Sequence, residues 1–61
     1  MKLKKLLKNQ AKAEQRIKVC HDTGMFVTVE YDGEVQGLKE DVLEKELVTW
    51  QIVDNVIVAY I

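Results

Sequence analysis

The C-terminal residues 46–61 constrain the fold of this chain more than any other segment. Two apolar runs, 47–53 and 56–61, flank the dipeptide Asp54-Asn55, a pattern typical of a β-hairpin with a two-residue turn. The second run is apolar at nearly every position, as in strands that are covered on both faces. A chain of 61 residues has little material with which to cover both faces. The pattern therefore predicts a hairpin that meets another surface, most simply a second copy of the chain.

The two-residue turn also predicts which residues face each other across the hairpin. Counting outward from Asp54-Asn55 pairs Trp50 with Ala59, and cross-strand partners lie on the same face of a sheet. We expect the Trp50 face to be core and Trp50→Ala to unfold the protein, because truncating a buried Trp costs about 3–5 kcal/mol. The opposite face is mixed and predicts an oligomer interface formed by Thr49, Gln51, Val53, Val56, Val58 and Tyr60.

Hydrophobic periodicity and turn residues divide the rest of the chain. A leucine face at helical spacing begins the sequence, alternating segments follow, and Asp32-Gly33 is a strong turn signal. The expected elements are a helix over 2–13, strands over 15–20, 25–31 and 34–36, a short helix over 38–44, and strands over 47–53 and 56–61. These predict one α+β domain over 1–61, with the N-terminal helix packed on a small antiparallel sheet of four or five strands that ends in the C-terminal hairpin. The predicted core comprises Leu6, Leu7, Ile17, Val19, Val27, Val29, Leu43, Val48, Trp50, Ile52, Ile57 and Ala59.

Composition narrows the class of protein. The chain is 48% hydrophobic and 31% charged, which is typical of a globular domain and not of a disordered one. One cysteine cannot form an internal disulfide, and no Cys/His cluster has zinc-site spacing. Because small domains without such staples often oligomerise, we expect a dimer or a tetramer. Neither a signal peptide nor a membrane-length segment is recognisable, so we expect a cytoplasmic protein with no membrane partner and no cofactor.

Charge is distributed unevenly along the chain. Residues 1–18 carry a net charge of +6 and residues 19–61 a net charge of −7. This asymmetry suggests either an anion-binding patch or complementary self-docking. Nucleic-acid binding is therefore an alternative function, in which phosphates would be contacted by Lys2, Lys4, Lys5, Lys8, Lys12, Arg16 and Lys18.

Candidate catalytic residues are few. Cys20 ends the strand predicted over 15–20 and His21 opens the turn after it, and adjacent residues of an extended chain point to opposite faces, which disfavours a nucleophile–base pair. Four acids, Asp22, Glu30, Asp32 and Glu34, could hold magnesium if their loops converged, so a metal-dependent nicking nuclease with Asp22 and Asp32 as candidates stays open. The chain has no glycine-rich phosphate loop, nucleophile elbow or zinc-ligand spacing. The sequence thus favours a binding protein without a resident metal over an enzyme.

Several segments together resemble small proteins of phages and prophages of Gram-positive bacteria. The resemblance lies in the lysine- and leucine-rich opening helix, the strand Ile17-Lys18-Val19, the segment Leu43-Glu44-Lys45-Glu46-Leu47-Val48-Thr49-Trp50, and the run Asp54-Asn55-Val56-Ile57-Val58. Proteins of this kind with known roles are host-takeover and counter-defence factors, including anti-CRISPR inhibitors, nucleotide-signal sponges and small DNA-binding oligomers. The resemblance implies action on a host macromolecule in the host cytoplasm, and it assigns no site residue. A nucleotide-signal sponge with a ligand pocket at the subunit interface is a further alternative function.

Overall fold

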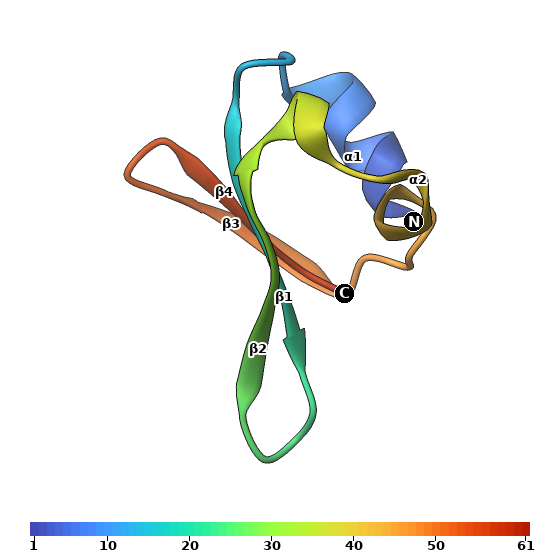
Figure 1. Cartoon of the computed structure of the whole chain (residues 1–61), viewed down its shortest axis with the longest axis vertical. Coiled ribbons are helices and arrows are strands. Elements are labelled where there is room, and N and C mark those ends of the chain that lie inside the picture. Colours follow the sequence, from blue (N-terminus) through green and yellow to red (C-terminus); the bar gives the residue numbers. More distant parts are fainter.

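A four-stranded sheet with strand order β2-β1-β4-β3 carries both α-helices on one face (Figure 1). The computed structural model describes all 61 residues. Along the chain the elements are α1 (Leu3–Gln10), β1 (Arg16–Asp22), β2 (Val27–Glu34), the 3₁₀ helix η1 (Val35–Gly37), α2 (Glu40–Leu43), β3 (Thr49–Val53) and β4 (Val56–Tyr60). The expected α+β architecture, with an N-terminal helix and a C-terminal hairpin, is confirmed. No helix is long and apolar enough to cross a bilayer.

One pairing in the sheet differs from the expected antiparallel arrangement. β1 and β4 run parallel, whereas β1–β2 and β3–β4 are antiparallel. The segment between β2 and β3 contains η1 and α2 and carries the chain along the helix-bearing face from one end of the sheet to the other (Figure 1). β4 therefore runs parallel to β1. A crossover connection allows this orientation, whereas a hairpin does not. The sheet is mixed as a result.

The C-terminal hairpin has the predicted register. Thr49 pairs with Tyr60, Trp50 with Ala59, and Val53 with Val56. Asp54 and Asn55 have φ angles of 51° and 66°. Positive φ at both central residues defines a type I′ turn, whose twist suits a two-residue hairpin. The turn chemistry therefore fixes the pairing.

The Asp32-Gly33 dipeptide is not a turn, and the strand expected over 34–36 is wrong. Both residues lie within β2, and the 3₁₀ helix η1 follows. Gly33 serves the packing of Tyr31, since a Cβ on Gly33 would lie 2.9 Å from the Tyr31 hydroxyl. That hydroxyl donates a hydrogen bond of 2.6 Å to the carbonyl of Glu34. Gly33 therefore allows the Tyr31 side chain to approach the backbone closely, and the chain does not reverse its direction at this glycine.

A β-bulge in β2 places Val27 and Val29 outside the core, contrary to the prediction. Val19 pairs with Tyr31 and Cys20 pairs with Val29, so Glu30 has no partner on β1. An extra residue changes which side chains share a face. Tyr31 packs against the core, while Val27 and Val29 are half-exposed.

The core lies between α1 and the two central strands. Its fully buried members are Leu3, Leu6, Leu7, Ile17, Val19, Ile57 and Ala59. Leu43 packs against them while partly exposed. The prediction was wrong for Val48, Trp50 and Ile52, which are exposed, and it omitted Leu3 and Cys20, which are buried. β3 is an edge strand, and α1 covers the central strands and not β3.

α1 ends at Gln10, earlier than the expected residue 13. Ala11 is extended, with ψ 144°. The carbonyls of Ala13 and Gln15 accept hydrogen bonds from the amides of Gln36 and Val35 at 3.1 and 2.9 Å. Tertiary pairing of this backbone with the η1 segment replaces the last helical turn.

Candidate assembly surface

Four exposed apolar side chains lie at the sheet edge formed by β3 and the residue before it. On the helix-bearing face, Ile52 is 60% exposed and Trp50 is 36% exposed, and Val48, the residue directly before β3, is 76% exposed. Val53, on the opposite face, is 47% exposed. Contiguous apolar exposure on a small protein is typical of an interaction site. We call Val48, Trp50, Ile52 and Val53 the β3 patch.

The other face of the sheet carries no helix, and we call it the open face. Two registered rows of side chains cross it, one formed by Thr49, Tyr60, Cys20 and Val29 and the next by Gln51, Val58, Lys18 and Asp32. The first row is mainly apolar, and Cys20 is buried within it. The second row ends in two charged residues. All six predicted interface residues therefore lie on the open face and have charged neighbours there. They are Thr49, Gln51, Val53, Val56, Val58 and Tyr60.

The loop between β1 and β2 forms a second exposed apolar feature. Met25 is 89% exposed and Phe26 is 63% exposed. The loop is shaped by Asp22 Oδ1, which accepts a hydrogen bond of 2.8 Å from the amide of Gly24, and by a positive φ of 92° at Gly24. The hairpin extends away from the helices (Figure 1), so this tip is separate from the β3 patch.

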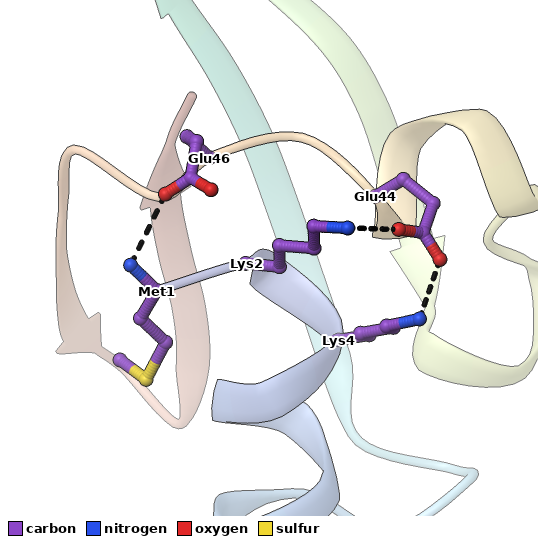
Figure 2. Close-up of polar contacts among 5 residues, drawn as sticks. All are labelled: Met1, Lys2, Lys4, Glu44 and Glu46. Atoms are coloured by element: carbon purple, nitrogen blue, oxygen red, sulfur yellow. Dashed lines mark hydrogen bonds and ion pairs between the residues drawn. The ribbon is translucent and has the colours of Figure 1, made fainter.

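Two lysines of the N-terminal segment share one carboxylate. Lys2 and Lys4 bind the two oxygens of Glu44 at 2.7 and 2.5 Å, and the Met1 amine lies 3.1 Å from Glu46 (Figure 2). Backbone hydrogen bonds support the contact, from the Leu3 amide to the Lys45 carbonyl and from the Leu47 amide to the Met1 carbonyl. These bonds hold the start of α1 against the segment that leads into β3.

The paired charges alter the acidity of Glu44. Hydrogen bonds from Lys2 and then Lys4 lower the pKa of Glu44 to about 2. The same contact raises the pKa of Lys2. Both groups are solvent-exposed, so salt will screen the interaction.

The seven predicted phosphate-contacting residues do not form one patch. Lys5 and Lys8 lie on α1, where they line a shallow pocket of about 690 Å³ together with Lys4 and Asn9. Arg16 and Lys18 lie on β1, and Arg16 pairs with Asp32 at 3.3 Å. Lys5, Lys8, Lys12 and Lys18 form no ion pair. The unpaired cations are thus divided among α1, the loop that follows it, where Lys12 lies, and the open face.

The candidate catalytic residues are also separated. Asp22 pairs with Val27 at one end of the β1–β2 hairpin, and Asp32 pairs with Lys18 toward the other end. Asp22 accepts a bond from the loop and Asp32 accepts one from Arg16. No group of three or more His, Cys, Asp or Glu side chains is arranged to hold a metal ion. His21 Nδ1 lies 2.7 Å from the carbonyl oxygen of Ile61, and Cys20 lies on the other side of the strand.

Sequence reasoning missed the exposure of Val48, Trp50 and Ile52, which it placed in the core. The apolar sequence of β3 was a usable signal, because an apolar strand has a neighbour on only one side if it lies at the edge of a sheet. That β3 would be an edge depends on the long-range parallel pairing of β1 with β4, which local patterning does not reveal. The chain matches no family model, no curated protein and no solved structure.

Proposed function

We propose that this protein is a non-enzymatic binding module that acts as a homo-oligomer. The observation that carries the proposal is the β3 patch, which exposes Trp50, Ile52 and Val53 on a strand with no neighbour on one side, and Val48 directly before that strand. Exposed apolar residues of this size favour association, because about 25 cal/mol is gained per Å² of apolar area removed from water. A domain of 61 residues also gains stability from association.

The assembled protein would act on a host macromolecule in phage–host conflict. Resemblance to small phage and prophage proteins supports this setting. The exposed residues Met25 and Phe26 would contact the partner, since the loop between β1 and β2 that contains them lies away from β3 and stays free in an oligomer that uses the β3 patch. Large flexible apolar side chains such as Met and Phe are favoured at interfaces.

Multi-angle light scattering across micromolar concentrations tests the assembly. We expect a dimer or tetramer for the wild type and a monomer for Ile52→Lys, which places a charge in the β3 patch. Met25→Lys is the matched control, because it adds the same charge at an exposed apolar position outside the patch. A monomeric wild type across this range would overturn the proposal.

Phage plating tests the biological role. Bacteria that carry a defence system and express the wild-type chain should allow a restricted phage to form more plaques than bacteria with an empty vector. Met25→Ser combined with Phe26→Ser should lose this effect and keep the oligomer mass, because the tip lies outside the assembly surface. Equal plating with and without the chain, across several defence systems, would count against counter-defence.

Nucleic-acid binding by α1 is a second candidate function. The specific observation in its favour is that Lys5, Lys8 and Lys12 form no ion pair within the chain. Such lysines are available to phosphates, and binding through them would weaken steeply with salt. Filter binding at low salt should detect the complex, and Lys5→Ala with Lys8→Ala should weaken it more than the control Lys39→Ala. No retention at low salt would remove this candidate.

A further inference from the structure

The two edges of the sheet are built differently. β2, at one edge, carries three acidic residues, Glu30, Asp32 and Glu34, and it contains a bulge. Charges and bulges on edge strands prevent pairing with another strand. β3, at the other edge, has the sequence Thr-Trp-Gln-Ile-Val, with no charge, no proline and no bulge in its pairing with β4. The chain thus protects one edge and leaves the other open.

The open edge offers backbone groups at two particular residues. In a hairpin with a two-residue turn, the pair that flanks the turn is hydrogen-bonded, and the pattern then alternates along the strands. Val53, Gln51 and Thr49 therefore direct their amides and carbonyls toward β4. The amides and carbonyls of Trp50 and Ile52 point away from the sheet, and they require water or another strand as partner.

We propose that β3 pairs antiparallel with β3 of a second copy, about a two-fold axis at Gln51, which joins the two sheets into one of eight strands. This inference rests on the proposed function and specifies its interface. In this register Trp50 lies beside the partner's Ile52, and the two residues exchange backbone hydrogen bonds. The two indole rings and two isoleucines then extend the cores of both copies, because Trp50 and Ile52 already lie opposite the buried Ala59 and Ile57.

The open face is a poorer site for a dry interface. Its central row contains Lys18 and Asp32, and Arg16 lies next to them on β1. Burying charged groups between two copies costs several kcal/mol per ion unless each is well paired. Edge pairing leaves these charges in water. The geometry therefore favours pairing edge to edge over stacking face to face.

Charge and symmetry also favour the β3 of a second copy, over other strands, as the partner of the open β3 edge. Pairing β3 with the acidic β2 edge of another copy would bring carboxylates against a strand that has no cation to pair with them. The two-fold register about Gln51 instead places apolar Trp50 beside the partner's Ile52 and sets the Gln51 amides side by side. The central residues of the strand thus pair apolar with apolar and amide with amide.

Cross-linking tests the register. Gln51→Cys is made in the Cys20→Ala background, so that the introduced thiol is the only one. At the two-fold axis the Gln51 pair is not hydrogen-bonded, which brings the two Cα atoms to about 4.5 Å, within the range of a disulfide. Mild oxidation should therefore give a covalent dimer. Thr49→Cys in the same background is the matched control, because Thr49 lies opposite the partner's Val53 and two Thr49→Cys chains should stay unlinked.

Three results bear on the inference. A disulfide dimer with Gln51→Cys but not with Thr49→Cys supports the register. An oligomer by light scattering that gives no Gln51→Cys disulfide, or that links equally through Thr49→Cys, overturns the pairing and leaves the proposed assembly standing. A monomer overturns both.

In the unmodified chain, Trp50 fluorescence should shift to shorter wavelength over the same concentration range as association, and an unchanged spectrum through association would contradict burial of Trp50.

Discussion

Trp50 on β3 lies directly opposite Ala59 on β4, yet the two residues differ in burial. Ala59 is completely buried and Trp50 keeps 36% of its surface exposed. Both side chains lie on the helix-bearing face of the sheet, because cross-strand partners share a face. The difference arises from their strands, since β4 is central and β3 is an edge.

The exposure of Trp50 changes the expected effect of Trp50→Ala. A fully buried Trp would cost about 3–5 kcal/mol on truncation, and the partial exposure reduces the expected loss to about 2 kcal/mol. The total stability expected for a chain of this length is about 3–9 kcal/mol. We therefore predict that Trp50→Ala, at a concentration that keeps the protein monomeric, still unfolds cooperatively in urea, at a lower midpoint, when followed by far-ultraviolet circular dichroism. A variant without a cooperative transition would show that Trp50 supports the fold as a fully buried residue does.

Ile17 on β1 is a more sensitive position than any residue of β3. Its side chain is completely buried between α1 and the sheet. Ile17→Ala should cost about 2–5 kcal/mol, which approaches the whole stability of a small domain. Ile52→Ala is the matched control, because it removes the same atoms from a side chain that is 60% exposed. Urea denaturation at a concentration that keeps both variants monomeric should show a much larger loss for Ile17→Ala, and equal losses would contradict this assignment of the core.

Local signals in the sequence predicted the C-terminal hairpin residue by residue. Asp54 and Asn55 tolerate positive φ, and that requirement alone sets every pair from Val53–Val56 to Thr49–Tyr60. The leucine face of α1 was equally readable, because helical spacing places Leu3, Leu6 and Leu7 on one side. These features depend on neighbours within a few residues.

Features that depend on distant contacts were not predictable in the same way. The turn signal of Asp32-Gly33 was misleading, because Gly33 makes room for Tyr31 within β2. One unpaired residue, Glu30, moved Val27 and Val29 from the predicted core to the open face. The exposure of Trp50 follows from the order of strands, which the parallel β1–β4 pair determines.

Tyr31 and Gly37 are predicted to be energetically coupled. A Cβ on Gly37 would collide with the Tyr31 hydroxyl, which is held by its hydrogen bond of 2.6 Å to the Glu34 carbonyl. Gly37→Ala should therefore destabilise the protein by about 1–3 kcal/mol, as overpacking does. The loss should be smaller in a Tyr31→Phe background, where the hydroxyl is absent. A double-mutant cycle from urea denaturation measures this coupling, and additive losses would contradict the close approach.

Glu44 is predicted to make folding stability depend on pH in the acid range. Its hydrogen bonds to Lys2 and Lys4 lower its pKa from 4.5 to about 2 in the folded protein. A lowered pKa means that the folded state favours the carboxylate, so the stabilisation is complete above pH 4.5 and disappears as pH falls toward 2. The urea midpoint of the wild type should exceed that of Glu44→Gln at neutral pH, and the difference should decline over this interval.

The control for Glu44, which is the C-cap of α2, is Glu40→Gln, which changes a carboxylate in the first turn of that helix that forms no ion pair. Its difference from the wild type should vary less with pH between 4.5 and 2 than that of Glu44→Gln. Added salt should reduce the Glu44 effect, because both partners are exposed to solvent and ions screen the pair. A wild type and a Glu44→Gln variant whose midpoints differ by the same amount at pH 7 and at pH 2 would show that the Lys2–Glu44–Lys4 contact does not form in solution.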